Sequence, residues 1–120
     1  MYRRHLFNRS LLILCTLTLV ISSTALAASH GDDRSDAWEN VSKMIKFIES
    51  GDVSSTELAG NRAIGSIEKA IDQENDQSKR DKLRDAITAV KEALGNASRG
   101  EWPYAEGAAK RALKLVEEAK

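Results

Sequence analysis

The sequence predicts an all-α protein: an antiparallel four-helix bundle made of two duplicated helical hairpins. Residues 36–70 align with residues 85–119 at a constant offset of 49 without a gap, and ten of the aligned positions are identical. In both copies the apolar residues recur every three or four positions, which is the spacing of one face of a helix. A repeat of this length indicates that one helix-turn-helix unit is used twice.

The identical positions define what the two copies share. They are Asp36/Asp85, Ala37/Ala86, Val41/Val90, Gly51/Gly100, Glu57/Glu106, Ala59/Ala108, Arg62/Arg111, Ala63/Ala112, Glu68/Glu117 and Ala70/Ala119. From them we expect a shared turn glycine, a shared stripe of small residues and shared apolar spacing, with outward-facing residues that differ. The repeat therefore predicts packing rather than activity.

Residues 1–27 have the pattern of a secretory signal peptide. Three arginines and no acid stand within residues 1–9, residues 11–21 are almost wholly apolar, and Ala25 and Ala27 supply the small residues that precede cleavage. The apolar run is shorter than the roughly 20 residues of a membrane span, so we expect membrane contact only through an uncleaved signal. The predicted location is periplasmic or secreted.

Cleavage after Ala27 leaves 93 residues, which we divide into a flexible mature N-terminus at 28–35 and a bundle at 36–120. The single cysteine, Cys15, is lost with the signal, so helix packing has to supply the stability. The remaining 15 basic and 18 acidic residues give a net charge of −3. This balance argues against nucleic acid as a partner.

The first predicted hairpin covers residues 36–71 and the second covers residues 79–119. The apolar sets of the four helices are Trp38, Val41, Ile45, Ile48; Ala59, Ala63, Ile64, Ile67, Ile71; Leu83, Ile87, Val90, Leu94; and Ala105, Ala108, Ala112, Val116, Ala119. The second helix of each hairpin carries the small residues, which let helix axes approach closely. We also expect Phe47 and Trp102 to cap the core near the turns.

Helix-ending and helix-starting residues support these boundaries. Gly51 and Gly100 stand where a helix must end, because glycine tolerates the left-handed conformation found there. Ser54 with Glu57 and Ser78 with Asp81 fit capping patterns. Pro103 suits the first turn of the last helix, and the polar run 72–77 is the expected linker between hairpins.

The residue types needed for common catalysis are scarce. After cleavage His30 is the only histidine, so neither a nucleophilic triad nor an ordinary zinc site can be built, and we expect no enzyme. Acidic residues alternate at Asp72, Glu74 and Asp76, as in a calcium loop, but a glutamine and a leucine occupy the positions of its glycine and its bidentate glutamate. A solvated linker explains this run better.

The mature N-terminus offers the one nitrogen-rich metal site. Cleavage after Ala27 leaves Ala28-Ser29-His30, whose free amine, two amide nitrogens and imidazole can surround Cu(II) or Ni(II) in a square plane. The alternative is that His30 is an ordinary polar residue of a leader. Cleavage one residue later would remove the chelate.

Two family resemblances follow from the helix pattern. Glycine-ended helices followed by alanine-rich ones make the chain similar to the bacterial small metal-binding proteins, and this resemblance implies an exported four-helix bundle that takes up copper or nickel. It is carried by Ala86, Ala89, Val90, Ala93, Leu94, Gly100, Ala105, Ala108, Ala112 and Leu113 and by their counterparts Val41, Gly51, Ala59, Ala63 and Ile64. Lysines, one arginine, an asparagine and a glutamate stand at the outward positions where that family has histidines, so no metal site is carried over to the helices.

The segment from Gly100 through Trp102, Ala105 and Ala109 to Leu113 resembles the second half of a tetratricopeptide motif. That resemblance implies a protein- or peptide-interaction module. We therefore expect a non-enzymatic bundle that binds metal through residues 28–30, with an interaction module as the alternative. Both a monomer and a dimer with exchanged hairpins fit the pattern.

Overall fold

The computed structural model describes residues 33–120, and within this range the chain is helical with no strand. The first bundle helix covers residues 33–50 of the described chain, and it is followed by α2 (Val53–Gln73), α3 (Gln77–Ser98) and α4 (Trp102–Glu118). Residues 33–35, which are part of the predicted flexible N-terminus, are helical and belong to the first bundle helix. The predicted helical bundle is confirmed. The predicted signal peptide and residues 28–30 lie outside the described residues.

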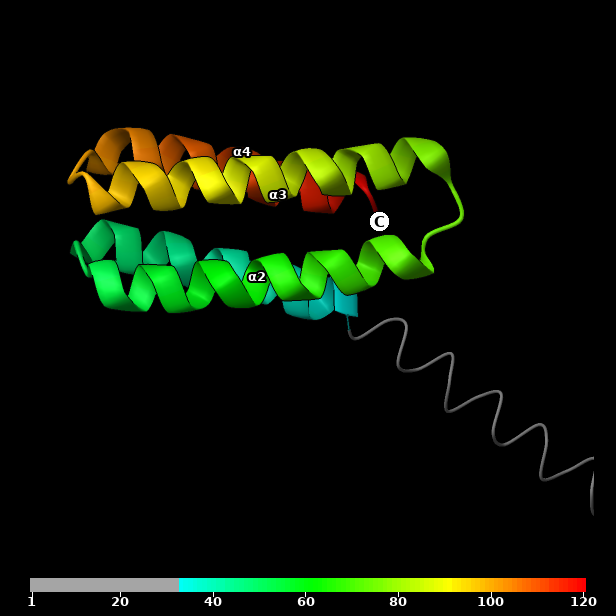
Figure 1. The fold of residues 1–120 in the computed structure, drawn as a ribbon, viewed down its shortest axis with the longest axis horizontal. Helices are drawn as coiled ribbons and strands as arrows, with labels where there is room; N and C mark the ends of the chain where they lie inside the picture. The colour runs from blue at the N-terminus through cyan, green and yellow to red at the C-terminus, as the bar shows by residue number, and fades with distance from the viewer. Residues whose placement is uncertain (1–32) are drawn as a thin grey trace, which may run out of the picture. The chain divides into compact units, whose positions relative to one another are not determined.

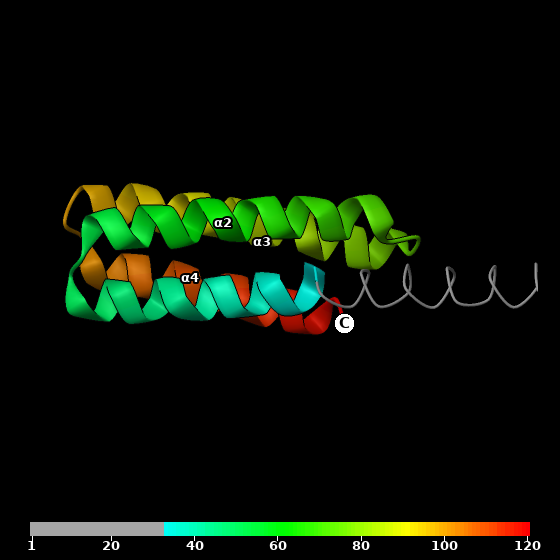
Figure 2. The same cartoon turned by 90° about the horizontal axis from the view of Figure 1, so that it is seen from below.

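The helices lie side by side, and the chain turns back at short connections (Figure 1). Residues 51–52 and 99–101 turn at one end of the bundle, and residues 74–76 connect α2 to α3 at the other. α3 packs against both α2 and α4. Trp38 of the first bundle helix donates from Nε1 to Glu117 Oε1 of α4 at 2.8 Å, and Figure 2 shows these two helices together on one side.

The core is built mainly from alanine. Of the twenty buried apolar residues in the described chain, thirteen are alanines, and Val41, Met44, Ile48, Ile67, Leu83, Val90 and Val116 fill the remaining space. Every position buried in residues 36–70 is also buried 49 residues later. Thr56 and Ala105 form one such pair, and Met44 and Ala93 form another. The two copies therefore present the same helix faces to the core even where the residue types differ.

The two tight turns have the same hydrogen bonds. Gly51 has a φ of 69°, its N–H donates to Ile48 O at 3.1 Å, and the next N–H donates to Phe47 O at 3.0 Å. Gly100 has a φ of 75°, and its turn repeats both bonds to residues 97 and 96 at 3.0 and 2.9 Å. This is the Schellman pattern, which satisfies the last carbonyls of a helix and requires a left-handed residue. The prediction for both glycines is confirmed.

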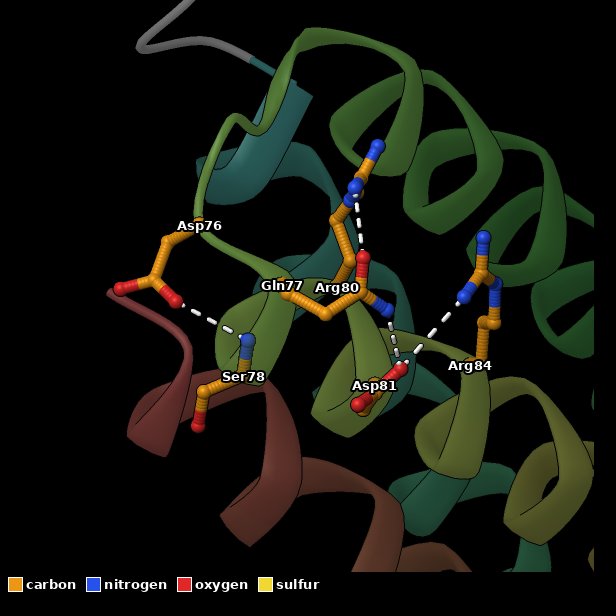
Figure 3. Close-up of polar contacts among 6 residues, drawn as sticks. All are labelled: Asp76, Gln77, Ser78, Arg80, Asp81 and Arg84. Carbon is orange, nitrogen blue, oxygen red and sulfur yellow. Dashed lines mark hydrogen bonds and ion pairs between the residues drawn. The ribbon is translucent and has the colours of Figure 1, made fainter.

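The predicted helix starts need correction. Asp52, not Ser54, caps α2, because its carboxylate accepts from the N–H of Ser55 at 3.1 Å. Asp76, not Ser78, caps α3 by accepting from the N–H of Ser78 at 2.9 Å (Figure 3). In both cases the aspartate stands two residues upstream and reaches the free amide first. Pro103 lies in the first turn of α4, as predicted.

Two further expectations change. The linker is shorter than the predicted run 72–77, because α2 continues through Gln73 and α3 begins at Gln77. Trp38 is not a core residue: it is 37% exposed, and the neighbouring Ala37 is fully buried. The indole lies at the bundle edge, where its N–H reaches Glu117 and Lys120 Nζ lies 5.8 Å from the ring centre. Phe47 and Trp102 do pack partly buried against the core, as expected.

Candidate functional site

The predicted metal ligands Ala28, Ser29 and His30 lie outside the described residues. Among residues 33–120, no group of three or more histidine, cysteine, aspartate or glutamate side chains is arranged to hold a metal ion. None of the helices in this range is long and apolar enough to cross a membrane.

The acidic residues around the α2–α3 connection are engaged in the fold. Glu74 forms an ion pair with Arg34 of the first bundle helix. Asp76 caps α3, while Asp81 accepts from Gln77 Nε2 at 2.9 Å and pairs with Arg84 at 3.4 Å (Figure 3). These carboxylates serve a helix terminus and its neighbours rather than one common centre.

Among residues 33–120, two surface grooves lie at corresponding places, one on each half of the repeat. The first groove has a volume of about 260 Å³ and is lined by Asn40, Lys43, Phe47, Ser55, Leu58, Ala59 and Arg62. The second groove has a volume of about 390 Å³ and is lined by Glu92, Asn96, Glu101, Pro103, Tyr104, Gly107, Ala108 and Arg111. Six lining positions of the first groove, moved by 49 residues, become lining positions of the second. The two grooves therefore lie at equivalent positions of the sequence repeat and have different lining residues.

Helix packing creates this shared geometry. Ala59 and Ala108 are buried at equivalent places, and their small side chains leave a depression between the two helices of each copy. A larger, exposed side chain also lines each groove. Leu58 in the first groove is 55% exposed, and Tyr104 in the second is 71% exposed. Each groove therefore combines a depression with one exposed large apolar side chain that a partner could contact.

The charges of the two grooves differ. In the second groove Arg111 Nη2 donates to the carboxylate of Glu92, so an ion pair joins α4 to α3 across the groove. In the first groove the corresponding residues are Arg62 and Lys43, which are both positive. Lys43 pairs with Glu39 at 3.3 Å on its own helix, and Arg62 has no ion-pair partner within residues 33–120. The first groove is thus basic, while the arginine of the second groove is neutralised by Glu92.

A further depression continues the second groove along α3 and α4. It has a volume of about 350 Å³, shares Arg111 with the second groove, and is also lined by Asp85, Thr88, Ala89 and Leu115. Its only cation, Arg111, is the one already paired with Glu92. This extension therefore has no basic side chain to spare for a ligand.

Sequence reasoning missed both grooves. A depression depends on which outward residues two helices bring together, and the pattern of apolar residues carries no information on this. One signal was available: Arg62 and Arg111 are identical outward positions of the repeat. The expectation that outward residues differ between the copies is therefore wrong at this position.

Comparison with known proteins adds no relative: no protein-family model, no curated protein and no solved structure matches this chain.

Proposed function

We propose that the chain is a small, exported, non-enzymatic helical bundle that binds a protein or peptide partner. In this proposal the bundle is an antiparallel pair of duplicated hairpins. The observation that carries the interaction role is the pair of equivalent grooves, each with an exposed apolar residue beside a floor of buried alanine. Such a surface offers contact area without assembling convergent catalytic groups.

A test of this role compares partner capture by two forms of the protein. Immobilised protein is incubated with a periplasmic extract, and retained proteins are identified by mass spectrometry. The matched variant replaces both exposed residues, Leu58→Ser with Tyr104→Ser, and should keep its fold because neither residue is buried. A partner retained by the wild type and lost by the variant supports the proposal. Identical sets of retained proteins would contradict it.

We propose a second role, binding of divalent copper or nickel by Ala28-Ser29-His30. The sequence of these three residues supports it, because an N-terminal amine with histidine in the third position supplies four nitrogen ligands. The role depends on cleavage after Ala27. The exported chain would then be periplasmic or secreted, as a monomer or a dimer.

The metal role has its own measurement. Mass spectrometry of the exported protein identifies its first residue, and titration with copper sulfate should produce a visible d–d band at one equivalent. His30→Ala removes the imidazole and should abolish the band, whereas zinc should not compete, because it generally cannot displace the amide protons. A first residue other than Ala28 would exclude this chelate.

A further inference from the structure

We propose that the first groove binds an acidic, amphipathic helical segment of a partner protein, with an apolar side chain on Phe47 and Leu58 and a carboxylate at Arg62. The inference rests on the proposed interaction role and names the chemistry of the partner. It commits to the first groove rather than to its equivalent on the second half of the repeat.

The charge of the first groove selects an acidic ligand. The repeat keeps an arginine at both positions, but the glutamate that neutralises Arg111 is replaced by Lys43 in the first copy. Two cations that line one depression attract a carboxylate, and a guanidinium can bind it through two parallel hydrogen bonds. Glu39 competes only weakly, because its pair with Lys43 is exposed on both sides.

The apolar part of the first groove selects a side chain rather than a small molecule. Its volume of about 260 Å³ lies below the range of about 300–1,000 Å³ typical of small-molecule pockets. Phe47 is partly buried and packs against the core, and Leu58, which is 55% exposed, lies beside the buried Ala59. One or two apolar side chains at helical spacing would cover both residues, as in other helix-in-groove complexes.

The net charge argues for a peptide rather than a lipid surface. Without residues 1–27 the chain carries a charge of −3, so an anionic bilayer would repel the protein as a whole. Within the first groove, the attraction for an anion comes from Lys43 and Arg62. A local carboxylate on a short segment matches this limited basic surface better than an extended membrane does.

The second groove provides the matched control. It retains the arginine, yet the Glu92 carboxylate occupies it. Asn96 stands in place of Phe47, and Gly107 stands in place of Leu58. The second copy therefore lacks both the Phe47–Leu58 pair and the spare cation, and its exposed Tyr104 stands at the position of Ser55 instead.

The experiment selects ligands and then maps them. A displayed library of random short peptides is panned on purified protein, and the enriched peptides are measured by fluorescence anisotropy. We expect enriched sequences to carry aspartate or glutamate within one helical turn of leucine, isoleucine or phenylalanine. Arg62→Gln should weaken their binding about tenfold or more, through loss of a charge-assisted contact. Leu58→Ser should weaken it as well, while the matched Arg111→Gln should leave it unchanged.

The outcomes separate this inference from the proposed function. Enriched peptides that bind Arg62→Gln and wild type equally would overturn the first groove as the site and leave the interaction role standing. Enrichment of basic peptides would overturn the charge argument. Absence of any enriched peptide would count against both proposals. Phosphatidylglycerol vesicles that bind the wild type but not Arg62→Gln would replace the peptide with a lipid headgroup.

Discussion

The close approach of α2 and α3 at Gly60 gives the sharpest test of the packing. A Cβ at Gly60 would lie 2.7 Å from Leu94 Cδ2 and 3.0 Å from Leu94 Cγ, so the leucine would have to shift. Overpacking of this kind costs about 1–3 kcal/mol, while alanine gains about 1 kcal/mol over glycine inside a helix. We expect Gly60→Ala to destabilise the protein by about 0–2 kcal/mol.

The matched control lies on the same helix. A Cβ at Gly65 meets nothing within 4 Å, so Gly65→Ala should show only the helix-propensity gain of about 1 kcal/mol. In a domain of this size that gain raises Tm by about 4–8 °C, and Gly60→Ala should lower Tm by up to about twice as much. Thermal and urea unfolding followed by far-UV circular dichroism measure both variants.

A double-mutant cycle identifies the cause. In a Leu94→Ala background the conflicting side chain is gone, so Gly60→Ala should become stabilising like Gly65→Ala. If Gly60→Ala is as stable as Gly65→Ala in the original background, the close approach of α2 and α3 is wrong. If it stays destabilising in the Leu94→Ala background, contact with Leu94 is not the reason.

Two further predictions concern the turn between the first bundle helix and α2. Gly51→Ala should cost about 1 kcal/mol in urea unfolding, because an L-residue at φ 69° is strained and the nearest atom outside the turn, on Trp102, is 3.9 Å away. An unchanged midpoint would contradict the left-handed turn. Hydrogen bonds from the N–H and hydroxyl of Ser55 hold the pKa of Asp52 below its usual value. The resulting stabilisation is complete above the unfolded aspartate pKa of about 3.9 and is lost as pH falls through the lowered folded pKa. Asp52→Asn keeps the cap but does not titrate, so the wild type should lose Tm relative to Asp52→Asn on acidification, and parallel pH profiles would refute this.

The fold was predictable to the extent that local chemistry decides it. Glycine at position 51 or 100 is the residue that fits a left-handed helix end, and the apolar spacing then fixes which face of each helix is buried. The repeat even explains why Met44 and Ala93 are both buried although their sizes differ, because equivalent backbone positions face the same core. These features depend on residues that lie within one or two helical turns of each other in the sequence.

The features that sequence reasoning missed depend on competition or on distant contacts. At the start of α2, Asp52 and Ser54 are both good capping residues, and only the backbone geometry after Gly51 decides that the aspartate accepts the free amide. Trp38 has the correct helical spacing for the core, yet Glu117 of a distant helix offers its indole a partner at the edge. The grooves required knowledge of both helices at once.

A substitution in the first groove can also test the effects on stability and on binding separately. Lys43→Glu would restore the glutamate that the second copy has at position 92, and the new carboxylate could pair with Arg62 as Glu92 pairs with Arg111. The exposed pair gained and the exposed Glu39–Lys43 pair lost are each worth about 0–1 kcal/mol, so the free energy of unfolding should change by less than about 1 kcal/mol.

Binding should respond very differently to Lys43→Glu. The variant loses one cation and neutralises the other, so peptides selected on the wild type should bind it about tenfold more weakly or worse. Undiminished binding at unchanged stability would show that the charge of the first groove has no part in recognition. A loss of binding without a change in stability would mean that pairing Arg62 adds little to the stability of the fold, and that Arg62 beside Lys43 serves to bind an external anion.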